Sequence, residues 1–336
     1  MYREISKCRV SKSKNLIHIL SLGEQSLSGV FPMSKTEEVS KGPLDLVWCP
    51  ESNLLQLKQS YQPDEMYGDN YGYRSSLNIS MVNHIQNKIS YLERICQLSS
   101  GDLVIDVGSN DATLLKAYSN SNIIRVGVDP VGEKLKKYYT KGLEFIPDFF
   151  PTDILSKRFE NKKATIITSL AMFYDLEDPR HFVDGIVKIL DKEGVWHLEQ
   201  SYMPSMLKMT AYDTICHEHL EYYSLGNIKS ILNDCDLKIL DVQINDINGG
   251  SLAVTACHKK SMFKNENKSV IDWVLLQEER MSLNTPAPFR EFEKRVFEHR
   301  ANLLDLIKSL NNDGAKIFGY GASTKGNVLL QFCGIS

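Results

Sequence analysis

The spacing of hydrophobic and polar positions changes along the chain and divides it into three regions. In the first region, about residues 1–75, short apolar runs alternate with turn-forming residues. This pattern predicts short strands over 16–23, 44–49 and 54–61. From about residue 78 to 100, apolar residues recur every three or four positions, which is typical of an amphipathic helix.

The middle region, about 101–260, alternates continuous apolar runs with helical patterns. Strands are predicted over 103–108, 124–130, 143–150, 164–173 and 195–202, and helices over 113–119, 133–142 and 181–194. This alternation predicts an α/β fold with a parallel sheet and helices on both faces. A helix and two strands follow over 227–260, so we expect the sheet to end in an antiparallel pair.

The third region begins near residue 265 and is mostly helical, with an interruption at Pro286 and Pro288. From residue 315, the pattern predicts a strand, a glycine-rich turn and a helix. One strand and one helix cannot bury a core alone, so this unit either packs on the middle region or is part of a larger domain. We therefore expect three parts. They are a small module at 1–76, a central domain at 77–262, and a helical linker with a partial Rossmann-like unit at 263–336.

Composition and charge narrow the classes of function. The 336 residues are 42% hydrophobic and 24% charged, with a formal net charge of −3, so nothing favours a nucleic-acid or membrane partner. No apolar run reaches the length of a signal peptide or a membrane helix, and we expect a cytoplasmic protein. In a reducing compartment, most of the seven scattered cysteines are expected to be small buried residues.

The strongest chemical signal lies where two predicted strands end. The first strand runs into Asp106-Val107-Gly108 and the second ends at Asp129. Glycine allows a ligand to approach the backbone, and a carboxylate about 20 residues later can accept both hydroxyls of a ribose. The dinucleotide pattern G-x-G-x-x-G is absent. These features together favour an adenosyl ligand without pyrophosphate, such as S-adenosylmethionine (SAM), over an unrelated α/β sheet with polar strand ends.

A second cluster, Cys216 to Tyr223, holds two histidines and two glutamates. A neutral imidazole can remove a proton from a carbon beside a carbonyl, and a neighbouring carboxylate can stabilise the charged imidazole. A zinc site is the less favoured alternative, because side chains two positions apart diverge on a helix and the spacing H-E-x-x-H is missing. A polar surface loop is the remaining alternative.

Two glycine-rich segments are weaker signals. Asn248-Gly249-Gly250 precedes a strand and permits either a plain hairpin turn or a close approach to a ligand. The segment 319–326 resembles a phosphate-binding turn at a helix N-terminus, although it does not match the P-loop pattern. A strand-to-helix connection without a ligand is the alternative for this segment.

Two half-matched cysteine pairs lie in the first region. Cys8 is followed by Ser11, and Cys49 by Ser52, at the spacing of a C-x-x-C pair. Two complete pairs would predict a structural zinc site, but a serine hydroxyl is a poor zinc ligand compared with a thiolate. We therefore expect no tightly held zinc and assign no metal ligands.

The segments together resemble the sugar C-methyltransferases that build branched deoxysugars on nucleotide carriers. The likeness runs in order through nearly the whole chain. It is carried by CRV, YGDNYGYRS, VIDVGSNDATLL, GVDP, SLAMFYDLEDP, LEQSYM, YDTICHEHLEYYSL, NGGSLAV and GYGASTKGNVLLQ. The resemblance implies a small zinc-type module, a class I SAM-methyltransferase sheet and a C-terminal nucleotide-sugar-binding unit.

The resemblance also implies roles for individual residues. Cofactor contacts are expected from Asp106, Gly108, Ser109, Asn110, Asp111, Asp129, Pro130, Ser169, Leu170 and Met172. The catalytic segment contains His219 as the base, with Glu218, His217 and Tyr222 beside it. Contacts to the nucleotide-sugar substrate are expected from Tyr73, Asn248, Gly249, Gly250, Ser323, Thr324 and Lys325.

The chain departs from the family pattern at several positions. Cys216 stands where many members have tyrosine, and Asp175 lies in a segment where many have histidine. The C-terminal unit is also expected to be truncated.

The expected reaction is SAM-dependent C-methylation of a nucleotide-linked keto-deoxysugar through an enolate, with Tyr222 or Tyr223 as a donor to the oxyanion. The alternatives are an O- or N-methyltransferase acting on a related sugar, a non-catalytic remnant, and a nicotinamide enzyme that uses the C-terminal turn.

Overall fold

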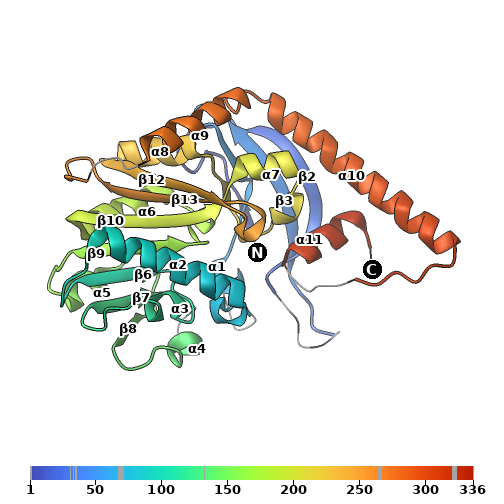
Figure 1. Cartoon of the computed structure of the whole chain (residues 1–336). Coiled ribbons are helices and arrows are strands. Elements are labelled where there is room, and N and C mark those ends of the chain that lie inside the picture. The colour runs from blue at the N-terminus through green and yellow to red at the C-terminus, as the bar shows by residue number, and fades with distance from the viewer. Residues whose placement is uncertain are drawn as a thin grey trace.

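The computed structural model shows a seven-stranded sheet at the centre of the molecule (Figure 1). It describes residues 2–30, 32, 34, 36–66, 72–131, 133–263, 267–319 and 324–335. The strands lie in the order β12-β13-β10-β9-β6-β7-β8. Their bounds are β6 Leu103–Val107, β7 Ile124–Val128, β8 Leu143–Ile146, β9 Ala164–Leu170, β10 Leu190–Ser201, β12 Leu237–Asn245 and β13 Ser251–His258.

The direction of the strands confirms the expected sheet. β6 pairs in parallel with β7 and β9, and the parallel pairing continues to β8 on one side and β10 on the other. β13 lies antiparallel between β10 and β12, which confirms the predicted antiparallel end. The carboxyl ends of the five parallel strands therefore meet at one edge of the sheet.

Helices cover both faces of this sheet (Figure 1). On one face, Ile85 and Ile89 of α2 (Ile79–Cys96) pack with Val104 and with α3 (Thr113–Lys116). On the other face, Ile105 packs in a core with α6, α8 and α9. These three helices are Pro179–Ile189, Leu225–Asp234 and Lys268–Arg280. Neighbouring residues of a strand point to opposite faces, so Val104 and Ile105 enter different cores.

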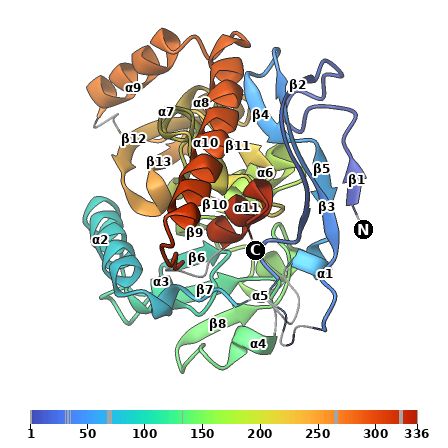
Figure 2. The ribbon, with the colours of Figure 1, turned by 90° about the vertical axis from the view of Figure 1, so that its right-hand side faces the viewer.

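The N-terminal strands form a separate sheet in the order β11-β4-β3-β2. Figure 2 shows β2 and β3 on one side of the molecule, away from α2 and β12. Their bounds are β2 Ile17–Ser26, β3 Lys41–Cys49, β4 Leu54–Leu57 and β11 Glu221–Tyr222, while β1 (Tyr2–Glu4) and β5 (Gln59–Tyr61) form a two-stranded pair. The two-residue strand β11 comes from the segment directly after His219 and pairs with β4.

A third core joins the N-terminal sheet to later helices. It contains Trp48 of β3 and Phe289 of α10, whose ring centroids lie 5.5 Å apart. The helices on this core are α7 Met203–Met209, α10 Ala287–Asn312 and α11 Thr324–Cys333. The remaining short helices are α1 Pro63–Met66, α4 Glu133–Lys136 and α5 Asp153–Arg158. No helix in the described ranges is long and apolar enough to cross a membrane.

Several sequence predictions of secondary structure are wrong, and the helix expected over 133–142 ends at Lys136. The strand expected from residue 315 does not form, and residues 315–319 are exposed, without a neighbouring strand to pair with. The helix expected over 181–194 ends at Ile189, and residues 190–194 start β10. Leu190 pairs with Ala164 of β9, so this segment joins the sheet instead of extending α6.

Candidate cofactor cavity and catalytic loop

A cavity of about 310 Å³ opens at the carboxyl ends of β6, β7, β9 and β10. Many of the residues expected from the sequence to contact ligands line it. They are Tyr73, Gly108, Asn110, Asp129, Pro130, Leu170, Met172 and Asn248. Ligand sites in open α/β sheets lie at this edge, so the cavity is where the fold places a cofactor.

The turn after β6 is shaped by Gly108 and Asp129. Gly108 has a φ of 73°, and a β-carbon there would lie 3.0 Å from Cγ of Met172, so glycine is required. Asp129 accepts hydrogen bonds from the backbone N–H groups of Asn110 at 2.8 Å and Val131 at 2.9 Å. Burial raises the pKa of Asp129, and these two bonds oppose the increase. Each carboxylate oxygen keeps a lone pair with which it can accept a ribose hydroxyl.

Four expected cofactor residues lie behind the cavity instead of lining it. Asp106 accepts a 2.6 Å hydrogen bond from Thr168, and burial raises the pKa of Asp106 to about 7. The hydroxyls of Ser109 and Tyr139 lie 2.5 Å apart, and Ser169 accepts a hydrogen bond from the indole of Trp196. Asp111 accepts from the backbone of Ser76 and the hydroxyl of Thr113. These side chains support the turns that line the cavity.

Asn110 holds the segment that contains Tyr73 at the cavity. Its amide nitrogen donates to the carbonyl of Tyr73 at 3.2 Å, and its amide oxygen accepts from the backbone of Ser75 at 3.2 Å. Tyr73 lines the cavity while half of the side chain remains exposed. The turn after β6 therefore also positions one expected substrate contact.

The H-E-H segment forms a loop beside the cavity, and none of His217, Glu218, His219 or Tyr222 is among the cavity-lining residues. The two histidines diverge. Nδ1 of His217 lies 3.0 Å from the hydroxyl of Ser28, whereas Nδ1 of His219 lies 2.9 Å from the carbonyl of Thr214. A carbonyl only accepts, so the proton of neutral His219 is on Nδ1 and its lone pair is on Nε2.

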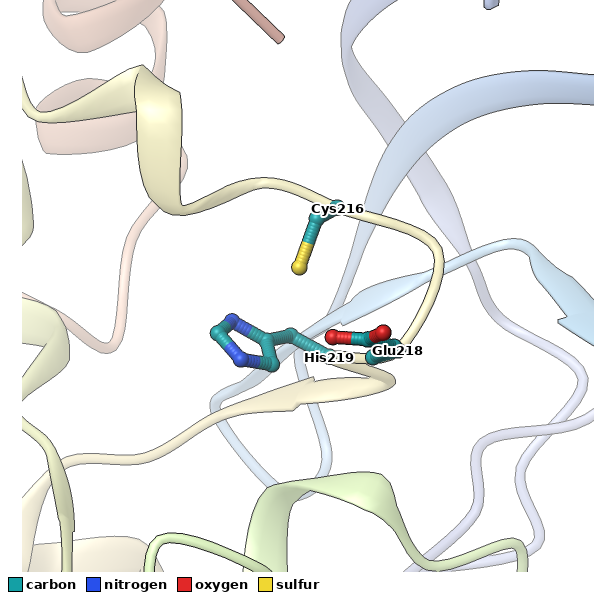
Figure 3. A group of neighbouring side chains, drawn as sticks. All are labelled: Cys216, Glu218 and His219. Carbon is teal, nitrogen blue, oxygen red and sulfur yellow. The ribbon is translucent and has the colours of Figure 1, made fainter. Parts of the chain in front are cut away.

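Burial favours the uncharged forms of the side chains in this loop. It raises the pKa of Glu218 to about 7 and raises the pKa of the Cys216 thiol well above its usual value. It lowers the pKa of His217 and of His219 to about 4. Figure 3 shows the sulfur of Cys216 and the carboxyl of Glu218 next to the ring of His219. The thiol sulfur, one carboxyl oxygen and one ring nitrogen of these residues lie within 4.8 Å of one another.

Lys325 connects the C-terminal region to the site. Its ammonium donates a 2.6 Å hydrogen bond to the carbonyl of Asn248, a residue of the cavity wall, and its charge helps lower the pKa of His219 after the larger effect of burial. The adjacent Gly249 and Gly250 have φ values of 87° and 120°, and a β-carbon on Gly250 would lie 2.8 Å from Ser205. Both positions therefore require glycine.

Of the other expected C-terminal contacts, Thr324 is the first residue of α11. Ser323 lies outside the described residues.

The sequence interpretation missed a pair of cavity residues. His84 of α2 and Glu199 of β10 both line the cavity, and Nε2 of His84 lies 2.6 Å from Oε1 of Glu199. Glu199 lies near the carboxyl end of its strand, as Asp106 and Asp129 do, so the same reasoning about strand ends applied to residues 195–202 would have found it.

The two half-matched cysteine pairs come together, but they do not fit a structural zinc ion. The thiol of Cys8 lies 3.2 Å from the hydroxyl of Ser52, and the hydroxyl of Ser11 lies 3.4 Å from the thiol of Cys49. A structural zinc ion takes four cysteine or histidine ligands, whereas this cluster offers two thiols and two hydroxyls. The cluster connects the two turns through paired hydrogen bonds.

Comparison with known proteins finds matches along nearly the whole chain. Residues 8–67 match the model of a putative zinc binding domain, residues 84–242 that of a methyltransferase domain, and residues 246–336 that of a C-methyltransferase C-terminal domain. The chain is 29% identical to the C-methyltransferase NovU of Streptomyces niveus over 338 residues, which cover 99% of this chain and 79% of NovU. The chain is a SAM-dependent C-methyltransferase.

Solved structures resemble this C-methyltransferase more distantly. The magnesium protoporphyrin IX methyltransferase of Synechocystis PCC 6803, solved with bound SAM, is 14% identical, with a TM-score of 0.41 over 57% of this chain and 87% of that one. A second similar structure is the complex between the Haloferax volcanii methyltransferase activator Trm112 and a methyltransferase. The matched chain is 17% identical, with a TM-score of 0.41 over 56% of this chain and 99% of that one.

Proposed function

We propose that this C-methyltransferase transfers the methyl group of SAM to the carbon beside the keto group of a nucleotide-linked deoxysugar, through an enolate. The observation that supports this most is the contact of Lys325 with Asn248. It brings a cation from the glycine-rich C-terminal turn to the wall of the cofactor cavity, beside His219. A cation is needed to bind the diphosphate of a nucleotide carrier. A base, here His219, is needed to remove the proton that gives the enolate.

We infer that SAM, which supplies an electrophilic methyl group when bound, occupies the cavity with its ribose at Asp129. Pro130 and Phe149 line the cavity next to Asp129 and offer apolar surface to the adenine. Gly108 leaves room for the methionine part, beside Leu170 and Met172. The reactive methyl group would then face the part of the cavity near Asn248.

In the proposed reaction, Nε2 of His219 removes the proton next to the keto group. The electrons of the broken C–H bond form the enolate, whose carbon takes the methyl group as the S–CH₃ bond breaks and S-adenosylhomocysteine leaves. Glu218 lies beside His219 and, when ionised, stabilises the imidazolium. Lys325 and Thr324 hold the diphosphate of the carrier, and Tyr73 contacts the sugar. Placing both reactants in one cavity contributes much of the rate.

Solvent exchange tests the proposal. The purified chain is first titrated with SAM by calorimetry, then mixed with S-adenosylhomocysteine and dTDP-, UDP- or GDP-linked 4-keto-6-deoxyhexoses in D₂O. We expect deuterium at the carbon next to the ketone, measured by mass spectrometry. An O- or N-methyltransferase gives no such exchange, so methyl transfer without exchange would reject the enolate.

A variant separates the role of His219 from that of the cofactor site. His219→Asn is expected to keep SAM affinity, because His219 does not line the cavity, and to lose exchange and methyl transfer. Full turnover in this variant would reject His219 as the base.

A further inference from the structure

The cofactor cavity has an acid–base pair on the wall formed by α2 and β10. His84 of α2 is half-buried and lines the cavity together with Glu199, which lies near the carboxyl end of β10. The 2.6 Å distance between Nε2 of His84 and Glu199 is that of a charge-assisted hydrogen bond. A histidine held by a carboxylate beside a ligand cavity is a recurring arrangement of catalytic sites.

Glu199 is held firmly as an anion. Its second oxygen accepts hydrogen bonds from the ammonium of Lys88 at 3.0 Å and the amide of Asn245 at 2.9 Å. Burial alone would raise the pKa of Glu199, but the hydrogen bond from His84 and the charge of Lys88 outweigh it and lower the pKa to about 2. The carboxylate therefore stays ionised and fixed in place across the neutral pH range.

The fixed carboxylate determines what His84 can do. Nε2–H points to Glu199, because an ionised carboxylate only accepts hydrogen bonds. Glu199 is the only hydrogen-bond partner of His84 among the described residues, which leaves Nδ1 available to a ligand in the cavity. When the imidazole is protonated, Nδ1–H is a donor to such a ligand.

The position of the pair in the cavity indicates which reactant it meets. Asp129, Pro130 and Phe149 lie at the ends of β7 and β8, where the adenosyl group is proposed to bind. β10 lies on the other side of β9, and its end lines the cavity together with Asn248. An acceptor that receives the methyl group across the end of β9 would place its ketone near His84.

We propose that His84 is a catalytic residue that donates an Nδ1–H hydrogen bond to the keto oxygen of the acceptor and stabilises the oxyanion formed as the enolate appears. Glu199 is its positioning residue. The step transfers no proton from His84, so the hydrogen bond strengthens with the charge and weakens again when the ketone re-forms. The inference rests on the proposed C-methylation. It gives the oxyanion role to a residue of the cavity wall in place of Tyr222 or Tyr223, which are buried outside it.

The test compares His84→Gln with the matched control His181→Gln, whose histidine is exposed on α6. Loss of one oxyanion donor typically lowers the rate by about 10²–10³-fold, so we expect a decrease of that size in solvent exchange with the 4-keto-6-deoxyhexose nucleotides. SAM affinity, measured by calorimetry, should stay within about twofold and also reports that the variant is folded. The control should exchange at the wild-type rate.

Glu199→Gln tests the positioning role of the carboxylate. The charged or titratable groups around His84 include Lys88 of its own helix and Glu199 and His197 of β10, and burial lowers the pKa of His197 to about 3, so that it stays neutral. In Glu199→Gln, we expect the rate of exchange at saturating nucleotide-sugar to decrease while SAM affinity stays near the wild-type value, because the carboxylate that fixes the ring of His84 is lost.

Two results would overturn the inference: wild-type exchange in His84→Gln, or a loss of exchange explained by weaker SAM binding. If the wild-type chain exchanges with none of the nucleotide-linked keto-sugars, the proposed function fails and the role of His84 fails with it. Exchange in the wild type with an unaffected His84→Gln rejects only the inference about His84.

Discussion

Gly29 lies directly against the carboxyl of Glu218, so that a β-carbon on residue 29 would overlap Oε1 of the glutamate. Gly29 is in the N-terminal region between β2 and β3, and Glu218 is in the H-E-H loop. The N-terminal module therefore forms part of the wall around the proposed catalytic loop.

Gly29→Ala is expected to displace Glu218 and reduce methyl transfer by about tenfold or more, since small misplacements at catalytic groups have large effects on rate. SAM affinity should be unchanged, because neither residue lines the cofactor cavity. Steady-state kinetics and calorimetry measure the two effects. The double variant Gly29→Ala/Glu218→Asp, with its shorter acid, should recover part of the activity. An equally inactive double variant, or a fully active single variant, would contradict the proposed contact.

Glu218 should make the protein less stable as pH rises. Burial raises the pKa of its carboxyl from 4.5 to about 7. Between these values the folded state binds more protons than the unfolded state, so the free energy of unfolding falls by about 3 kcal/mol as pH rises from 4.5 to above 7. Glu218→Gln removes this change. Urea denaturation at pH 4 and pH 8 measures the difference between variant and wild type, in which the contribution of Asp106 cancels. A pH-independent difference would show that Glu218 titrates normally.

Asp129→Asn is expected to weaken SAM binding. The amide keeps the size of the side chain but loses one acceptor oxygen and the negative charge, both of which favour ribose hydroxyls and the backbone N–H groups of Asn110 and Val131. Hydrogen bonds to charged groups contribute about 1.5–3 kcal/mol, so we expect about a 10–100-fold higher Kd by calorimetry. Asp148→Asn, at another acidic residue of the cavity wall, is the matched control. Equal affinity of wild type and Asp129→Asn would place the ribose elsewhere.

The double variant Ser11→Cys/Ser52→Cys should create a zinc site. The four side chains already meet in two thiol–hydroxyl pairs, at 3.2 Å and 3.4 Å, so four thiolates would stand in about the arrangement that Zn²⁺ takes. We expect one equivalent of bound Zn²⁺ by elemental analysis and a higher Tm that EDTA reverses. Each single variant offers three thiols and serves as the control. Failure of the double variant to hold zinc would show that the two turns are not positioned for a metal.

The sequence predicted the parts of the site that depend on one strand and the turn after it. Gly108 and Asp129 each follow an apolar run, and parallel strands bring their ends to one edge, so both could be placed before the structure was known. The contact of Glu199 with His84 could not, because these residues are 115 positions apart and meet only when α2 packs on the sheet. The same holds for Gly29 and Glu218.

Two errors have the same physical origin. The residues from 315 have the composition of a strand, yet residues 315–319 are exposed and have no partner strand. Residues 190–194 continue a helical pattern, yet Leu190 pairs with Ala164 of β9 and the segment starts β10. The local sequence gives a segment a preference for helix or strand. Where the two preferences are similar, pairing with a distant strand determines which one forms.

The pairing of β11 with β4 limits which parts of this chain can be exchanged with a relative. The sequence models divide the chain near residues 67 and 84, as if the N-terminal part were a detachable accessory. Yet the residues that follow His219 complete the edge of the N-terminal sheet, with Glu221 opposite Gln56. A chimera that exchanges the first 76 residues would break this sheet within two residues of the proposed base. Swaps between relatives should therefore exchange the N-terminal sheet and the H-E-H loop together.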